Sequence, residues 1–357
     1  MLGDHGVIGD GDGGNTMNRS NRPINVAVGR DYDRTSILTS KANDELAIDG
    51  GEQRVTCTVL ASIHDAFRAL TSDGPYHAAE MSMAFYIALC DSETPPPFVA
   101  LPIFISRSFR YGNLYVKEGS PLTCVSDLRG KKIGLPEYGM TMGVWIRGML
   151  SDLHGISANE IEWVTTRDPV LSPIPSGVAR RGIKVSHLDE MTVWDALTRG
   201  LVDVAIGRPS PDSQHAGPFR PLLNDYWTYD VAYFRSTGIF PIMHTIAVRR
   251  NLCEEASGYE RLIFDAMCHA KSVAIEELRD CAGTLSVTLP SLPWVVESAI
   301  ATFGANWWPY GIEANKKALE TLLRYCHEQG VVESLQSVDE LFCPHSKQLI
   351  DSSSVGP

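Results

Sequence analysis

The chain has 357 residues, of which 44% are hydrophobic and 21% are charged. This composition can bury a large core, and the length suits about two domains. Its 43 acidic and 31 basic residues give a formal net charge of -12, which excludes the clustered basic surface that nucleic acids and anionic membranes require. If such a protein binds an anion, it needs a local basic pocket inside an acidic surface.

The chain ends and the cysteines indicate the compartment. Residues 1–22 are rich in Gly, Asp and Asn and lack the basic and apolar regions of a secretory signal, which predicts a disordered leader. Residues 346–357 predict a loose tail. No run approaches the ~18 apolar residues of a membrane helix. Eight cysteines without a CxxC motif indicate reduced thiols, so we expect a cytoplasmic protein.

The first third of the chain predicts three strands and a helix, and then a buried run. Residues 24–28 and 55–60 have the apolar pattern of short strands. Residues 78–89 (AAEMSMAFYIAL) predict a strand and then a helix. The prolines at 95–97 end this segment, because proline fixes φ and donates no hydrogen bond. The continuous apolar run 98–105 is typical of a buried strand.

The middle of the chain alternates between strands and helices. Strands are predicted over 113–117, 131–135, 160–164 and 202–207, and helices over 125–130, 141–153 and 191–199. Asp189 is the predicted cap of the last of these helices, and Gly200 is its predicted end. Residues 168–182 and 208–217 are rich in Pro, Ser and Gly and predict loops. This alternation indicates parallel α/β units.

The last third predicts a strand over 240–248 and long helices over 258–279 and 311–329. The fold class is therefore α/β, with two lobes. We expect lobe 1 to be discontinuous, combining 23–110 with 245–345, and lobe 2 to comprise 111–244. Ligands of such folds bind beside the carboxyl ends of strands and between domains, which predicts an interdomain cleft as the site.

Two arginines lie just after the apolar run 98–105. Arg107 and Arg110 are in the segment 106–111 (SRSFRY), together with two serine hydroxyls. A guanidinium group stays charged and offers paired donors, which suits a carboxylate at a strand end. The alternative is a surface turn with solvated arginines.

A second candidate anion site is the join between strand 131–135 and helix 141–153. The start of a helix leaves free backbone N–H groups that bind anions, and Thr141 adds a hydroxyl. Arg147 lies about 120° around the helix from Thr141, because successive helical residues are about 100° apart. Arg147 reaches such a pocket only through its length, and the alternative is a surface salt bridge.

Two residues are candidates for proton transfer. His244 comes after an apolar run where the chain returns to lobe 1, and histidine titrates near neutrality. A lone histidine in this setting is otherwise a satisfied core residue. Glu80 is surrounded by Ala and Met, and burial there would raise its pKa and make it a proton donor. Its alternative is a carboxylate facing solvent at a helix start.

Several common signatures are absent from the sequence. It contains no GxGxxG motif after a predicted strand, and no GxxxxGK[ST], HExxH or GxSxG motif. The histidines and cysteines show no metal-ligand spacing, so no metal site is predicted.

Four separate segments carry a family resemblance. They are LPIFISRSFR (101–110), DLRGKKIGLPEYGMTMGVWIRG (127–148), TGIFPIMHTIAVRR (237–250) and WPYGIEANKKALETLLRYCHEQG (308–330). With them the chain resembles 4,5-dihydroxyphthalate decarboxylase and its relatives from about residue 24 to residue 345. The resemblance implies the type II periplasmic-binding-protein-like fold, with two α/β lobes and a cleft between them.

The resemblance also implies an activity, namely removal of a carboxyl group from a hydroxylated aromatic acid without an organic cofactor. A general acid would protonate the ipso carbon as CO₂ leaves. On this interpretation Arg107, Arg110 and Arg147 bind carboxylate, Thr141 holds an oxyanion, and His244 and Glu80 compete for the role of acid. Tyr310 would cover the ring or bind a phenol, and its alternative is core packing.

The segment 165–183 matches nothing in the family pattern, so a hydroxylated aromatic acid other than 4,5-dihydroxyphthalate is an open alternative. The rival interpretation is a non-catalytic cytoplasmic carboxylate-binding protein of the same fold. In either case the expected partner is a small aromatic acid, with no nucleic acid and no membrane. The sequence leaves a homo-oligomer open.

Overall fold

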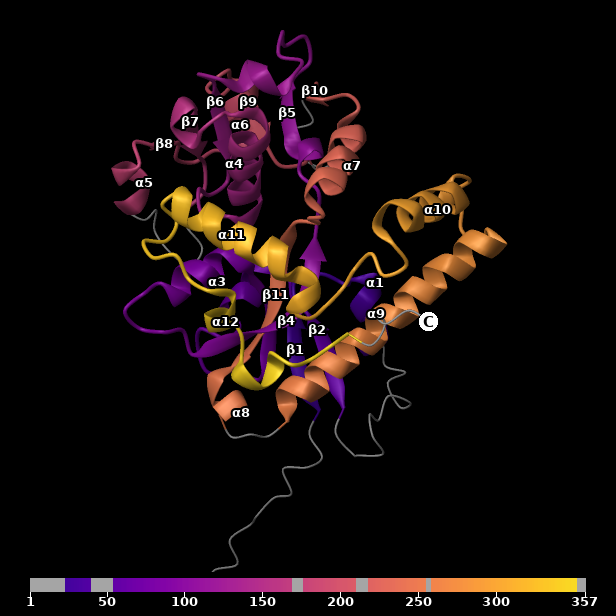
Figure 1. Cartoon of the computed structure of the whole chain (residues 1–357). Helices are drawn as coiled ribbons and strands as arrows, with labels where there is room; N and C mark the ends of the chain where they lie inside the picture. Colours follow the sequence, from indigo (N-terminus) through magenta and orange to yellow (C-terminus); the bar gives the residue numbers. More distant parts are fainter. Residues whose placement is uncertain (1–22, 40–53, 169–175, 210–217, 255–257, 352–357) are drawn as a thin grey trace, which may run out of the picture.

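The computed structural model describes residues 23–39, 54–168, 176–209, 218–254 and 258–351. The predicted leader and half of the predicted tail (352–357) lie outside the described residues, as do parts of the two predicted loops. Within the described residues the chain forms two sheets flanked by helices (Figure 1).

The first sheet has five strands in the order β2-β1-β3-β11-β4. Its strands are β1 (Ile24–Val28), β2 (Val55–Val59), β3 (Ala78–Ser82), β4 (Phe98–Arg107) and β11 (Ile242–Arg249). β1 pairs in parallel with β2 and β3, whereas β11 runs antiparallel to β3 and β4. All of β3 and nearly all of β4 are buried, because helices cover both faces of such a sheet.

The second sheet has six strands in the order β10-β5-β9-β6-β7-β8. Its strands are β5 (Leu114–Lys117), β6 (Lys132–Leu135), β7 (Glu162–Thr165), β8 (Lys184–His187), β9 (Val204–Ile206) and β10 (Phe219–Pro221). β6, β7, β8 and β9 form the parallel part of this sheet. The strands of this lobe therefore come from the middle of the chain, and those of the other lobe come from both sides of it.

Twelve α-helices of at least four residues lie within the described ranges. In the lobe of the first sheet they are α1 (Asp33–Thr39), α2 (Ile63–Arg68), α3 (Met83–Cys90), α8 (Arg250–Glu254), α9 (Tyr259–Thr284), α10 (Leu292–Phe303), α11 (Lys316–Glu328) and α12 (Val338–Leu341). In the lobe of the second sheet they are α4 (Thr141–His154), α5 (Ser176–Arg180), α6 (Val193–Thr198) and α7 (Tyr226–Thr237). None of them has the length and apolar character needed to cross a membrane.

Some predicted elements are wrong in detail. Thr192, not Asp189, caps α6, because the Thr192 hydroxyl accepts from Asp195 N while the Asp195 carboxylate accepts from Thr192 N. The predicted loop 168–182 contains α5. The predicted helix 311–329 begins only at Lys316, after a separate 3₁₀ turn. The sequence patterns do not predict α7 and α10.

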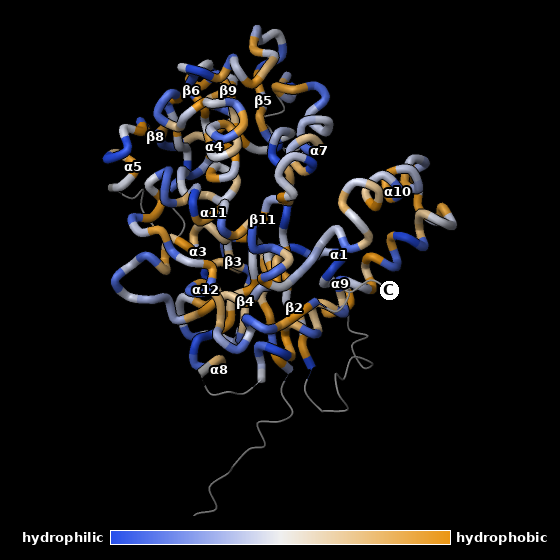
Figure 2. The backbone as a smooth tube through the Cα atoms, in the orientation of Figure 1, coloured by the Kyte–Doolittle hydropathy of each residue, from blue (hydrophilic) through white to orange (hydrophobic). Residues whose placement is uncertain are grey.

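The two lobes are joined by β4, by β11 and by the packing of α11. In Figure 1 α11 lies across the junction of the lobes, and it contacts both α3 and α4. The side chain of Gln329, just after α11, accepts from Arg147 Nε at 2.6 Å and donates to Val144 O at 2.9 Å, both on α4. Figure 2 shows apolar residues along the strands of the first sheet, and the largest buried cluster extends from there into the second sheet.

Candidate active site

A buried carboxylate lies at the centre of the candidate site. Glu80, on β3, is 0% exposed, and its two oxygens accept three hydrogen bonds. Oε1 accepts from the Tyr32 hydroxyl and from His244 Nδ1, each at 2.7 Å, and Oε2 accepts from Gly29 N at 2.9 Å. Three donors from separate parts of the chain therefore fix this side chain.

The fold brings these donors together because β1, β3 and β11 are close in the first sheet. Gly29 and Tyr32 come after β1, which pairs in parallel with β3, so both residues emerge at the edge where β3 ends. Gly29 lies so close to α2 that a Cβ atom would come within 2.5 Å of Ile63 Cα. A residue without a side chain is thus needed where the backbone N–H approaches Glu80.

The pKa of Glu80 lies below its ordinary value of 4.5. Burial alone would raise this pKa, but the hydrogen bond and positive charge of His244 lower it, as do the hydrogen bonds from Tyr32 and Gly29. The prediction of a raised pKa is therefore wrong in direction. Burial and the neighbouring Glu80 charge raise the pKa of the Tyr32 hydroxyl, which keeps it a donor. Glu80 is held as a carboxylate.

His244 lies on β11, opposite Ser82 of β3 and Ser106 of β4. Residues that alternate along a strand share a face, so Glu80 and Ser82 lie on the same face as His244. The side chain of His244 is 21% exposed, in contrast to the fully buried Glu80. Its ring meets the Phe67 ring edge-on at 5.1 Å. His244 is thus oriented from two sides and still reachable.

Thr141 joins the two lobes beside this pair. Its hydroxyl lies 2.9 Å from Ser82 Oγ and accepts from Ala84 N at 3.1 Å. Thr141 begins α4, and Ala84 is the second residue of α3, so two helix starts meet at this contact. Helix starts carry partial positive charge and free N–H groups, which favours an anion nearby.

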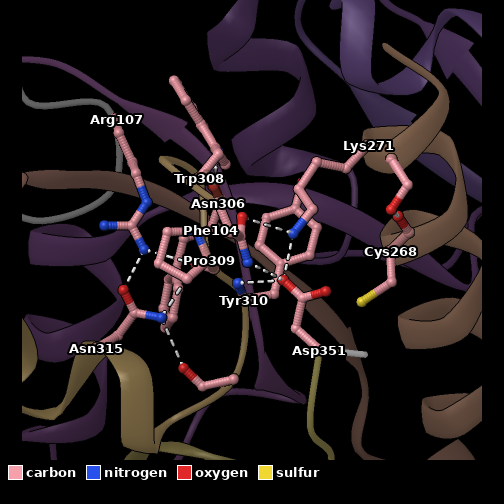
Figure 3. A network of polar contacts seen from close by, with 12 residues as sticks. Phe104, Arg107, Cys268, Lys271, Asn306, Trp308, Pro309, Tyr310, Asn315 and Asp351 are labelled. Atoms are coloured by element: carbon pink, nitrogen blue, oxygen red, sulfur yellow. Dashed lines mark hydrogen bonds and ion pairs between the residues drawn. The ribbon is translucent and has the colours of Figure 1, made fainter. Parts of the chain in front are cut away.

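Arg107 and Tyr310 lie in a polar network that Figure 3 shows from close by. The Arg107 guanidinium donates to Phe240 O at 3.0 Å, to Pro309 O at 2.9 Å and to the Asn315 side chain. Tyr310 is 1% exposed, and Lys271 Nζ lies 4.8 Å from its ring centre. Both side chains therefore serve the protein's own packing in this structure, and their contact with substrate stays a prediction.

Arg110 and Arg147 are also buried, at 8% and 1% exposure, so neither is a surface arginine. Arg110 donates to Asn113 Oδ1 at 3.2 Å. Arg147 donates to Gln329 and to Tyr138 O, and its guanidinium lies 3.8 Å from the centre of the Tyr138 ring. Burial lowers the pKa of Arg110 to about 9, which leaves it charged at neutral pH. Their binding of substrate carboxylate stays a prediction.

The site contains residues that the sequence did not indicate. Tyr32, Gly29, Phe67 and Ser82 lie in short segments without a motif. Ser82 could have been found from β3, because it shares a strand face with Glu80. The other three come from elements whose pairing is not visible in the sequence. Within the described ranges, no group of three or more His, Cys, Asp or Glu side chains is arranged to hold a metal ion.

Comparison with known proteins identifies two relatives of this chain. No protein-family model matches it. It is 29% identical over 332 residues to a 4,5-dihydroxyphthalate decarboxylase from Comamonas testosteroni, an alignment that covers 90% of this chain and 97% of that protein. It is 30% identical over 202 residues to a 4,5-dihydroxyphthalate decarboxylase from Pseudomonas putida, covering 55% of this chain and 73% of that protein.

Among solved structures, the chain is similar to the periplasmic aliphatic sulphonate-binding protein SsuA from Escherichia coli. The TM-score is 0.51 at 12% sequence identity, and the match covers 90% of this chain and 91% of that one. At this identity the likeness concerns the fold alone, and it confirms the predicted two-lobed α/β architecture. With the predicted resemblance confirmed as well, the chain belongs to the 4,5-dihydroxyphthalate decarboxylase family.

Proposed function

We propose that this protein is a carboxy-lyase that removes a carboxyl group from a phthalate-like, hydroxylated aromatic acid as CO₂. The observation that carries this proposal is the Glu80–His244 pair, a fixed buried carboxylate bonded to a partly exposed imidazole. Family membership supports the same reaction class, because both curated relatives are named as decarboxylases of 4,5-dihydroxyphthalate.

The hydrogen bond between the two residues sets the direction of proton transfer. Glu80 accepts through Oε1, so His244 donates through Nδ1. This fixes the orientation of the ring and leaves Nε2 to face a substrate. In the imidazolium form, Nε2 carries the proton to be transferred. His244 is therefore the proposed acid, and Glu80 the residue that orients it.

The proposed step consumes the substrate and one proton, and it yields CO₂ and the decarboxylated ring. A phenolic oxygen ortho or para to the reacting position donates electron density to the ipso carbon. His244 Nε2–H transfers its proton to that carbon, and a C–H bond forms. The C–C bond to the carboxylate then breaks, its electron pair returns to the ring, and CO₂ leaves. Neutral His244 regains a proton from solvent, to which its side chain is partly exposed. The ring takes up the electrons itself, so the proposal requires no organic cofactor.

The anionic substrate needs positive potential in a protein of formal charge -12. The starts of α3 and α4 supply it beside His244, where Thr141 and Ser82 meet. Arg107, Arg110 and Arg147 are also buried, and in this proposal they add positive charge to the protein interior. In this proposal the pocket, rather than the surface, captures a small aromatic acid.

The direct test is to incubate the purified protein with 4,5-dihydroxyphthalate and a panel of hydroxylated benzoates and to measure CO₂ release. We expect release from at least one acid with a hydroxyl ortho or para to a carboxylate. If calorimetry shows binding while none of the acids releases CO₂, the protein is a small-molecule binding protein and the decarboxylase proposal is wrong.

A further inference from the structure

The carboxyl ends of the parallel strands in the two lobes face each other. At the first sheet, Gly29 and Ser82 mark the ends of β1 and β3. At the second sheet, Thr141 comes after β6 and a short loop. The Ser82–Thr141 contact of 2.9 Å shows that these two edges meet. Side chains just beyond the neighbouring strands β2 and β7 therefore lie beside the same site.

Arg167 lies just beyond β7 at this edge. Its backbone N–H and that of Thr166 donate to Pro136 O, which fixes Arg167 beside the loop that leads into α4. Glu137, in that loop, accepts from Arg167 Nε at 2.8 Å and Nη2 at 2.6 Å, both through Oε1. The Glu137 side chain is 3% exposed, so its position is fixed by the core. Arg167 is held on one side of its guanidinium.

Arg167 differs from the arginines described above in the exposure of its side chain. Its side chain is 39% exposed, whereas Arg107, Arg110 and Arg147 are each no more than 8% exposed and donate to the protein's own oxygens. Arg34, near Glu80, is stacked on the rings of Tyr32 and Trp308 and is already bonded to Ile105 O. Arg167 is a fixed cation that still has donors to offer.

His64 lies at the opposite edge, in the first turn of α2, the helix after β2. Its ring meets the Phe67 ring at 6.0 Å, and Phe67 in turn meets His244 at 5.1 Å, so one phenylalanine lies beside both imidazoles. Burial lowers the pKa of His64, and the nearby positive charge of Arg167 lowers it further. The lowered pKa favours the neutral imidazole, and His64 and Arg167 come from the two lobe edges that meet at the Ser82–Thr141 contact.

From this geometry we infer that Arg167 anchors the carboxylate that the substrate keeps, with His64 as its hydrogen-bonding neighbour across the two lobes. The inference rests on the proposed decarboxylation and names its substrate class as aromatic dicarboxylates. The reacting carboxylate would lie near His244 and the helix starts, and the retained one at Arg167. Arg167 is also the third residue of the segment 165–183, which lies outside the four segments that carry the family resemblance, so we expect this anchor to be a specificity residue of this chain.

The retained carboxylate allows a test that does not depend on turnover. Loss of one carboxylate from 4,5-dihydroxyphthalate gives 3,4-dihydroxybenzoate, which keeps the anchored group, and catechol lacks it. Binding of both compounds is measured by calorimetry to wild type, Arg167→Gln and Arg199→Gln. Arg199 is an exposed arginine after α6 in the same lobe, so its loss changes the net charge equally.

We expect Arg167→Gln to weaken binding of 3,4-dihydroxybenzoate by about tenfold or more, since a charge-assisted paired contact is lost. Catechol binding should not change, and Arg199→Gln should behave as wild type. For turnover of 4,5-dihydroxyphthalate, KM should rise while kcat changes little. Arg167→Lys retains the charge beside Glu137 and is the second variant if the glutamine variant fails to fold. It should weaken binding of the acid about threefold or more, because an ammonium lacks the paired donors.

Unchanged affinity for 3,4-dihydroxybenzoate in these variants would overturn the anchor, as would a wild-type protein that binds this acid no more tightly than catechol. The two proposals fail separately. Binding that depends on Arg167 without CO₂ release contradicts the decarboxylation alone. Release of CO₂ with binding that ignores Arg167 contradicts the anchor alone.

Discussion

At the scale of single residues, one buried carboxylate controls the site. Glu80 has no exposed surface, and its carboxylate oxygens accept three hydrogen bonds. An ionised group in such a place is tolerated only when its partners replace the lost water. Gly29, Tyr32 and His244 do so, and the net result is a pKa below the ordinary value. The same contacts that stabilise the carboxylate orient the imidazole.

Glu80→Gln should therefore lower the free energy of unfolding near pH 7. A glutamine offers one acceptor oxygen and an NH₂ group, which would face donors from Gly29, Tyr32 and His244. We expect a loss of about 1–3 kcal/mol, the cost of unsatisfied buried polar groups. Because the pKa of Glu80 is lower in the folded state, its contribution is complete above the ordinary value of 4.5 and is lost as pH falls through the folded-state value.

The measurement is urea unfolding of wild type and Glu80→Gln between pH 7 and pH 3. The difference between them should be largest at neutral pH and shrink in the acid range. Glu277→Gln, an exposed carboxylate on α9, is the control and should not change stability measurably. Equal free energies of unfolding for wild type and Glu80→Gln at pH 7 would contradict the fixed carboxylate.

The sequence predicted part of this residue-scale picture. It indicated Glu80 and His244 as separate candidates from their apolar surroundings. It did not predict their contact, because 164 residues separate them and the hydrogen bond exists only once β3 and β11 pair. For the same reason it predicted the wrong direction of the Glu80 pKa. Burial of an acid can be inferred from its neighbours in the sequence, but its partners cannot.

At the scale of elements, close packing of β1 against α2 positions the site. Gly29 presents its N–H to Glu80 where any side chain would collide with Ile63. Gly29→Ala should destabilise the fold by about 1–3 kcal/mol through overpacking. It should also reduce turnover, since a displaced Gly29 N–H loosens the carboxylate that orients His244.

Gly283→Ala is the matched control for this variant. Gly283 lies within α9, where an added Cβ meets nothing within 4 Å, so alanine should stabilise the helix slightly and leave turnover unchanged. Thermal unfolding and CO₂ release of both variants test the prediction. Equal stability and equal turnover of wild type and Gly29→Ala would show that β1 and α2 do not position the site.

Local patterns predicted the elements with strong periodicity and missed those set by tertiary contacts. The predicted helix 141–153 matches α4, which ends at His154 before Gly155 in a left-handed conformation. The predicted cap of α6 is Asp189, although Thr192 and Asp195 form the reciprocal pair. α10 escapes prediction because its sequence, LPWVVESAIATF, is apolar nearly all round.

At the scale of the whole molecule, an acidic chain buries part of its positive charge. The formal charge is -12, whereas three arginines near the lobe junction are buried. On the proposed function, the global field repels an aromatic dianion, and only the positive groups at the site attract it. Since salt screens interactions across a surface over about 8–10 Å, it should weaken this repulsion.

The association rate constant of 3,4-dihydroxybenzoate should therefore rise, by no more than a few-fold, between low salt and about 0.15 M salt. Stopped-flow binding measures it, and uncharged catechol should show no such dependence. A marked fall in the association rate with salt would mean that the surface steers the acid toward the site, contrary to capture by the pocket alone.

The two-lobed architecture was predictable from alternating strands and helices, and the contacts between the lobes were not. The Ser82–Thr141 contact and the position of α11 across the junction involve segments far apart in the chain. The buried positions of Arg107 and Arg147 result from those contacts. A strand-end or helix position predicted these arginines as site residues, and only the fold shows which oxygens they already bind.

The central claim is that His244, oriented by Glu80, protonates the ring carbon. The most direct test is the rate of CO₂ release at saturating 4,5-dihydroxyphthalate for wild type and His244→Asn, with the exposed His269→Asn as control. We expect kcat to fall about 10²–10⁴-fold in His244→Asn, the contribution of a general acid, with KM changed only slightly. Turnover in His244→Asn equal to that of wild type would contradict the claim.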